Sequence, residues 1–192
     1  MSYSAGVNLD DPRAVRTRAR LRAAILELAA EQEISSITMS AVAKRAEVNR
    51  ATIYVHYPDV DTLVTDAMEE AVGAVARAAA LCPRQAPRDQ APAPLIELFT
   101  HVAAHSTLYA RMLGPTGSPR FAARMREQLT AELRRRFAEG RRPRGFDDVP
   151  ADLHAAYLAG ALVAVVAHWV TGHHPAAPDE IALAFWRLFR RC

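Results

Sequence analysis

The segment NRATIYVH combines an arginine, small side chains and two polar rings on consecutive turns of a predicted helix. Arg50 can donate two hydrogen bonds to the O6 and N7 atoms of guanine, while Ala51 and Thr52 are small enough to approach a thymine methyl group. Tyr54 and His56 suit hydrogen bonds to phosphate, which position a protein on DNA without reading its sequence. These residue types therefore favour the reading of bases in a DNA groove.

Two short helices joined by a tight turn would hold these side chains. Thr38 and Asn49 are good N-cap residues, because their side-chain oxygens can accept hydrogen bonds from the first free amides of a helix. Val48 and Ile53 can point inward and leave the polar residues of the second helix outside. The pattern is degenerate, so an ordinary packed surface helix is the alternative interpretation.

In its order of residues, this region resembles the N-terminal helix-turn-helix of the TetR family of transcriptional repressors. The resemblance runs from RARLRAAILELAAEQ through TMSAVAKRAEV to NRATIYVHYPDVDTL, and its second half rests on Val48, Asn49, Thr52, Ile53, Tyr54, His56, Tyr57, Asp61 and Leu63. Glu33 and Glu47 stand where the family usually has glycine, and Val60 stands where it usually has a phosphate-contacting lysine. The DNA contacts that we expect are Thr38, Ser40, Lys44, Asn49, Arg50, Ala51, Thr52, Tyr54 and His56.

Composition favours a globular protein with local positive charge. Hydrophobic residues make up 51% of the 192 residues, enough for a substantial core, and the net charge is only +3. So small a charge excludes a protein that coats nucleic acid and suits a specific binder. Scarce cysteines and the lack of a secretory signal predict a cytoplasmic protein. Only some of the arginines near the start can face DNA: Arg13, Arg16, Arg18, Arg20 and Arg22.

Helical patterns fill the chain, and they predict an all-α fold of about nine helices with no convincing strand. We expect a three-helix DNA-binding domain over residues 1–58 and a helical effector-binding and dimerisation domain over residues 59–192. Proline-rich segments break the second domain. Its expected helices cover residues 60–81, 95–106, 108–113, 119–139, 151–171 and 179–190. The apolar segment 155–170 falls short of the roughly 20 residues that span a bilayer, so we expect it to be buried.

The resemblance implies that the second domain forms a homodimer and binds a small effector. A stripe of small residues and an apolar last helix fit such an interface: Ala156, Gly160, Ala164, Phe185, Leu188 and Phe189. A two-fold dimer would place its recognition helices roughly 34 to 36 Å apart, which matches a palindromic operator. The alternative is that the stripe packs within one subunit.

Candidate residues for the effector pocket are mostly apolar with a few polar groups, as small-molecule sites are. They are His101, His105, Tyr109, Met112, Phe121, Met125, Tyr157 and Trp169. Each could instead be an ordinary core residue. His101 with His105, or His168 with His173 and His174, could bind zinc or nickel, but no cysteine or carboxylate completes a set. We therefore expect neither a metal nor a cofactor.

The function that we expect is a ligand-responsive repressor that binds operator DNA as a homodimer and is released by a small molecule. Two alternatives remain open. A helical protein-interaction module would pack its head on protein instead of DNA. An enzyme is disfavoured, because no phosphate-binding loop, nucleophile elbow or complete metal signature accompanies the histidines and carboxylates.

The valine at position 60 predicts one phosphate contact fewer per subunit than the family pattern. Introducing the lysine as Val60→Lys should therefore steepen the dependence of log affinity on log salt concentration by about 0.9. A salt titration of DNA binding, with the unchanged chain as the control, measures the two slopes. Identical slopes would show that this position does not face the DNA backbone.

Overall fold

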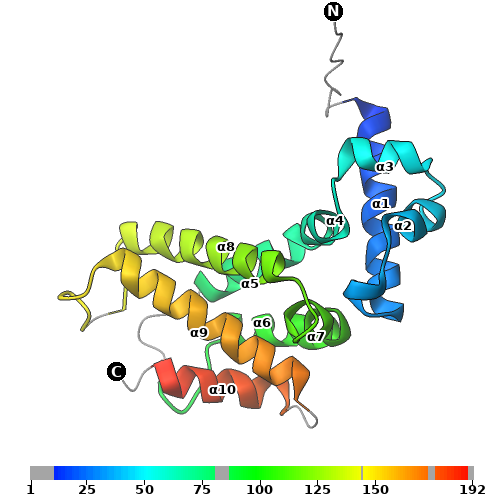
Figure 1. The fold of residues 1–192 in the computed structure, drawn as a ribbon. Helices are drawn as coiled ribbons and strands as arrows, with labels where there is room; N and C mark the ends of the chain where they lie inside the picture. The colour runs from blue at the N-terminus through cyan, green and yellow to red at the C-terminus, as the bar shows by residue number, and fades with distance from the viewer. Residues whose placement is uncertain (1–10, 81–86, 144, 173–175, 190–192) are drawn as a thin grey trace, which may run out of the picture. The chain divides into compact units, whose positions relative to one another are not determined.

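The computed structural model describes residues 11–80, 87–143, 145–172 and 176–189, and every regular element within them is helical (Figure 1). The predicted all-α fold is confirmed, with ten α-helices and one short 3-10 helix in this part of the chain. Contacts group the chain into two compact units, residues 1–68 and residues 69–192. The first unit therefore ends ten residues later than the boundary expected from sequence.

Four α-helices and the 3-10 helix make up the first unit, and a small apolar core holds them together. Leu21 and Ile25 of α1, Val42 of α2, Ile53 of α3 and Leu63 of α4 are fully buried. The helix α1 packs against both α2 and α4, and α2 packs against α3. The elements are α1 (Pro12–Glu31), η1 (Ile34–Ser36), α2 (Met39–Arg45), α3 (Arg50–His56) and α4 (Val60–Ala67).

A polar network around Asp66 ties α4 to α1 and to the residue that follows α3. The Asp66 carboxylate accepts hydrogen bonds from Arg22 Nε at 2.7 Å and from the Tyr57 hydroxyl at 2.5 Å. Arg18 adds a bond from its Nε to the Tyr57 oxygen at 3.4 Å. Burial opposes ionisation of Asp66, but the hydrogen bonds from Arg22 and Tyr57 outweigh it and lower the pKa of this carboxyl. Burial also raises the pKa of Tyr57, which keeps its proton for the bond to Asp66.

The second unit is a bundle of six helices. The helix α8 packs against α5 and α9, and α6 packs against α5 and α10. Figure 1 shows α9 lying between α8 and α10. The elements are α5 (Glu69–Ala80), α6 (Ala93–Ala104), α7 (Ser106–Leu113), α8 (Pro119–Ala138), α9 (Ala151–Thr171) and α10 (Pro178–Phe189).

Two tryptophans close the core of the second unit. Trp169 meets Phe99 edge to face with ring centroids 5.4 Å apart, and its Nε1 donates to the Ala176 carbonyl at 2.9 Å. Trp186 is also buried and donates to the Pro87 carbonyl at 2.7 Å. These bonds satisfy the indole donors and fix the segments that precede α6 and α10.

A single helix was expected over residues 60–81, and this prediction is wrong. The helix ends at Ala67, and α5 begins at Glu69, with Met68 between them in a non-helical conformation. No proline or glycine occurs at the break. A tertiary contact accompanies it instead, since Glu69 is held by Arg124 of α8 with Nη2 and Oε1 2.6 Å apart. Leu81 lies outside the described residues.

The bounds of α9 are those expected from sequence, residues 151–171. The helix extends beyond the apolar segment 155–170, so its full 21 residues are long enough to cross a membrane although that segment alone is not. By length and composition α9 alone among the described helices could do so, although core helices of soluble proteins pass the same test. One side of α9 packs into the bundle through Leu158, Leu162 and Val166.

Replacing Asp66 with asparagine should destabilise the first unit by about 1–3 kcal/mol, because Arg22 loses a charged acceptor in a half-buried site. The lowered pKa makes this contribution present above the ordinary aspartate pKa of about 4 and lost as the pH falls through the folded value. Amide hydrogen exchange in α1 and α4 at neutral and acid pH measures the effect. The tryptophans of the second unit provide the control, since their fluorescence should not change. If the amides of α1 and α4 exchanged equally slowly in the variant and in the unchanged protein at neutral pH, the role assigned to Asp66 would be contradicted.

Candidate nucleic-acid interface and effector site

The turn between α2 and α3 is closed by two backbone hydrogen bonds. The Val48 amide donates to the Ala43 carbonyl at 2.9 Å, and the Glu47 amide donates to the Lys44 carbonyl at 3.1 Å. This is the Schellman arrangement, which requires a left-handed residue after the helix. Glu47 fills that position with φ of 51°, the one positive value at a non-glycine residue in the described chain. The family's usual glycine would adopt it without strain.

The other glutamate at a family glycine position is different. Glu33 precedes η1 with φ of −62° and ψ of 140°, an extended conformation that any residue can adopt. Of these two departures from the family pattern, only the one at Glu47 costs backbone strain. Glu47 also accepts from Arg20 Nη2 at 3.1 Å, but both side chains are mostly exposed, so the pair stabilises little.

The helix α3 is held by its inner side and leaves its outer side free. Ile53 is fully buried, while Tyr54 and Val55 are 49% and 54% exposed. Arg50 and Ala51 are also exposed at the start of the helix. The structure thus places the expected base-reading residues on one short helix, with Arg50 and Ala51 exposed and Thr52 partly buried. Such a helix fits the width of the major groove.

The predicted N-caps are confirmed at both helices of the motif. Thr38 Oγ1 accepts from the Ala41 amide at 3.1 Å, and Asn49 Oδ1 accepts from the Ala51 amide at 2.8 Å. These oxygens are therefore occupied. The hydroxyl proton of Thr38 and the amide NH₂ of Asn49 remain as donors for phosphate.

Ion pairs decide which cations are free to meet DNA. Arg18 and Arg22 are directed to Asp66, and Arg45 is held by Glu27 and by Glu31, the latter at 2.8 Å. Sequence reasoning did not find these partners, because they lie 14 to 48 residues away. Within the described chain no such pair holds Lys44 or Arg50.

His56 offers only part of its ring. Its Nδ1 is buried and has no hydrogen-bond partner among the described residues. A phosphate can therefore reach this side chain only from the opposite edge of the imidazole. Ser40, the remaining expected contact, is exposed in the first turn of α2.

In the second unit, three of the expected effector residues form a chain of rings. Tyr109 lies 6.3 Å from both His101 and Phe121, measured between ring centroids. Met112, Met125 and Trp169 are buried in the same bundle, whereas His105 and Tyr157 are exposed. Tyr157 is 63% exposed and lies on the outer side of α9.

That outer side carries the small-residue stripe. Ala156 and Ala164 are exposed, and a Cβ at Gly160 would meet no atom within 4 Å. Large exposed apolar residues flank the stripe, with Leu153 at 61% and Leu188 at 62%. A hollow of about 350 Å³ adjoins it, lined by Phe146, His154, Tyr157, Leu158, Ala161, Val165, Phe185 and Leu188. The side chain of Phe189 lies outside the described part.

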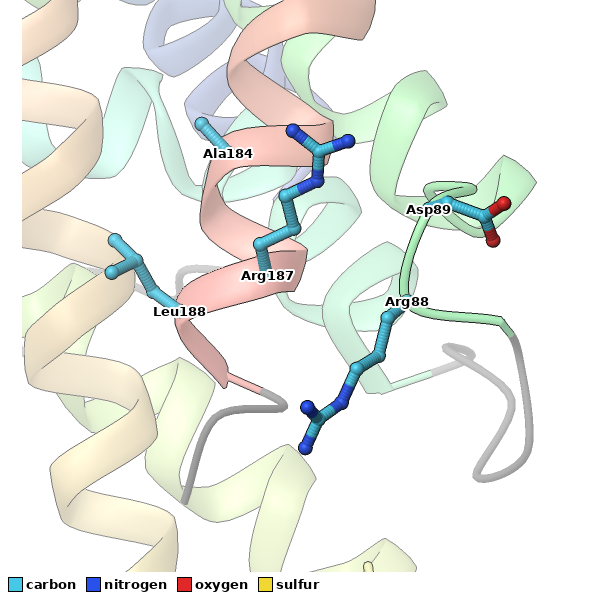
Figure 2. A pocket seen from close by; sticks show the side chains of 5 residues that line it. All are labelled: Arg88, Asp89, Ala184, Arg187 and Leu188. Atoms are coloured by element: carbon cyan, nitrogen blue, oxygen red, sulfur yellow. The ribbon is translucent and has the colours of Figure 1, made fainter.

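A second hollow, of about 580 Å³, lies between α10 and the segment before α6, and its lining residues are Arg88, Asp89, Ala184, Arg187 and Leu188. Figure 2 shows the guanidinium groups of Arg88 and Arg187 pointing in different directions, so they do not converge on one anion. Groups of three or more metal-ligating side chains are absent from the described residues. His173 and His174 lie outside that part.

Models of two protein families match the sequence. Residues 21–67 match that of the tetR family of bacterial regulatory proteins, and residues 89–191 match that of a transcriptional regulator C-terminal region. A curated relative, the uncharacterized HTH-type transcriptional regulator YxbF of Bacillus subtilis (strain 168), is 23% identical over 188 residues. The match covers 88% of this chain and 44% of the relative, so this chain spans less than half of that protein's length.

Solved structures share the fold. A TetR transcriptional regulator from Streptococcus agalactiae 2603V has a TM-score of 0.66 at 19% identity, covering 95% of this chain and 98% of that one. RolR in complex with resorcinol has a TM-score of 0.57 at 19% identity, covering 91% and 87%. The fold and its helix-turn-helix define a DNA-binding transcriptional regulator. With the family matches over both parts, the chain belongs to the TetR family of bacterial regulatory proteins.

The strain at Glu47 predicts that glycine stabilises the first unit. Glu47→Gly should raise its free energy of unfolding by about 1 kcal/mol, because the left-handed conformation is then relieved. Glu47→Ala is the matched control, since it also removes the pair with Arg20 but keeps the strained φ. Hydrogen exchange in α2 and α3 measures the stability of both variants. If Glu47→Gly were no more stable than Glu47→Ala, the assignment of strain to Glu47 would be refuted.

Proposed function

We propose that this protein is a cytoplasmic, non-enzymatic repressor that binds a palindromic operator as a homodimer and leaves it when a small effector binds. The observation that carries the proposal is the outer side of α3, where Arg50 is exposed and has no ion-pair partner in the described chain. An exposed cation on a helix held from behind by Ile53 is suited to a guanine edge in the major groove.

Contacts to phosphate would come from the start of each helix of the motif. Thr38 and Ser40 sit at the N-terminus of α2, where free amides and the positive helix end attract phosphate. Lys44 and Tyr54 add donors from the exposed surface, and His56 adds the accessible edge of its half-buried ring. These groups fix the orientation of α3, and Arg50, Ala51 and Thr52 read the bases.

Dimerisation through α9 and α10 is supported by their exposed apolar surface. Alanine and glycine along Ala156, Gly160 and Ala164 allow a second helix to approach closely. Leu188 and Phe185 extend the same surface onto α10, and a partner would cover Leu153 and Tyr157. Burial of such side chains is the main source of stability in permanent homodimers.

Coupling between effector and operator would pass through the break at Met68. On its C-terminal side, Arg124 and Gln128 of α8 hold Glu69 at the start of α5. On its N-terminal side, Asp66 is held to α1. An effector that moves α8 therefore acts on one end of a short connection whose other end is fixed in the DNA-binding unit. The effector releases DNA only if it binds the two conformations with different affinity.

The effector site among α6, α7 and α8 is supported by the buried rings of Tyr109 and Phe121 and by the half-buried ring of His101 beside them. RolR, which shares the fold, has been solved with resorcinol bound. We assign Met112, Met125 and Trp169 to the apolar lining of this site.

The double variant Arg50→Ala, Tyr54→Phe tests DNA reading. It should bind DNA from its own promoter region at least about tenfold more weakly, because each guanine contact is worth about 1–3 kcal/mol. Gel shift and fluorescence anisotropy at moderate salt measure the loss. The matched control is Arg126→Ala, which removes an exposed arginine from α8 in the other unit and should leave affinity unchanged. Circular dichroism and sedimentation should show the fold and dimer intact. Unchanged DNA affinity of the double variant would refute the proposal.

A further inference from the structure

Four side-chain polar atoms in the described part of the second unit are buried without a hydrogen-bond partner, and two of them lie on neighbouring aromatic rings. These two are the Tyr109 hydroxyl on α7 and Nε2 of His101 on α6. Tyr109 as a whole is fully buried. Buried polar atoms almost always have partners, so a water molecule or a ligand atom is expected beside each of these two groups.

The two atoms belong to one cluster. The rings of His101 and Tyr109 meet edge to face with centroids 6.3 Å apart, and Phe121 of α8 lies at the same distance on another side of Tyr109. The ring of His105 lies tilted beside that of His101 with centroids 4.8 Å apart, and its Nδ1–H donates to the His101 carbonyl at 2.9 Å. A ligand in this cluster would meet two polar atoms and otherwise aromatic surface.

Both side chains are neutral hydrogen-bonding groups. Burial raises the pKa of Tyr109, so its hydroxyl keeps its proton and donates. Burial, and then the proximity of His105, lowers the pKa of His101, which favours the uncharged imidazole. Arg124 on the neighbouring helix is already bound to Glu69. A charged ligand oxygen would therefore be buried without a counter-ion, which is costly.

We propose that this site binds a neutral, mainly apolar molecule through one hydroxyl or carbonyl oxygen. That oxygen accepts a hydrogen bond from Tyr109, and His101 Nε2 is its second partner. The inference rests on the proposed effector function and names the class of compound that it takes. Tyr109 is the residue that determines specificity, because it selects an oxygen over a methyl group of the same size.

Two methionines can make room for the ligand. Met112 follows Tyr109 by three residues on α7, and Met125 follows Phe121 by four on α8, so each shares a helix side with one of the rings. Both are buried. Their unbranched side chains change rotamer at low cost and adapt to a group of varied shape.

Phenol, toluene and benzoate are matched probes, since they share one ring and differ in the polar group. Calorimetry and thermal unfolding of the intact protein, at roughly millimolar probe, measure their binding. The wild type should prefer phenol to benzoate by at least about tenfold. In Tyr109→Phe the ratio of phenol to toluene affinity should fall about tenfold, the loss of one hydrogen bond.

The matched control is Thr107→Val, which removes an exposed hydroxyl from α7 of the same unit and should leave the ratio unchanged. Without probe, Tyr109→Phe should be at least as heat-stable as the wild type, because it removes an unpartnered buried hydroxyl. A purely structural tyrosine would give the opposite result, a less stable variant with an unchanged ratio.

Absence of phenol binding, an unchanged ratio in Tyr109→Phe, or benzoate binding as tight as phenol binding would each overturn the inference. Operator binding is measured without any probe. Intact operator binding with failed probes refutes only the ligand class, whereas probe binding without operator binding refutes only the proposed repressor.

Discussion

The Asp66 carboxylate is the contact on which the DNA-binding unit depends most. It accepts from Arg22 of α1 and from Tyr57, the residue that directly follows α3. One half-buried charge thereby fixes α4 on α1 and anchors the end of the recognition helix. Because hydrogen bonds to a charged acceptor are stronger than those between neutral groups, this network can hold a small unit whose apolar core is limited. The position of α3, the helix that carries Arg50, rests on that support.

The place of Asp66 in the chain is as important as the strength of its hydrogen bonds. Asp66 lies three residues before Glu69, close to the boundary between the two units. Each acid is held within a different unit, Asp66 by α1 and Glu69 by Arg124 of α8. The helix is interrupted between them at Met68. The covalent connection between the units is therefore only a few residues long, and a hydrogen-bonded carboxylate lies at each end of it.

The two glutamates at usual glycine positions of the family show that a sequence pattern alone does not reveal backbone strain. Glu33 is relaxed, whereas Glu47 adopts a left-handed conformation. The backbone hydrogen bonds of the turn from α2 to α3 impose that conformation, and Glu47 accepts it at a cost of about 1 kcal/mol. A similar distinction separates the arginines of α1. The sequence does not distinguish these arginines, but only some of them have a carboxylate within ion-pair distance.

Sequence alone determined the features that depend on near neighbours. The caps at Thr38 and Asn49, the bounds of α9 and the inward side of Ile53 follow from side chains within about four residues, where helix periodicity and capping act. Tertiary structure decided what depends on partners far along the chain: the break at Met68, the pairing of Arg18 and Arg22 with Asp66, the exposure of Tyr157 and the orphaned atoms of His101 and Tyr109. The physical reason is that burial and ion pairing depend on which distant segments pack together, and local periodicity carries no information about those neighbours.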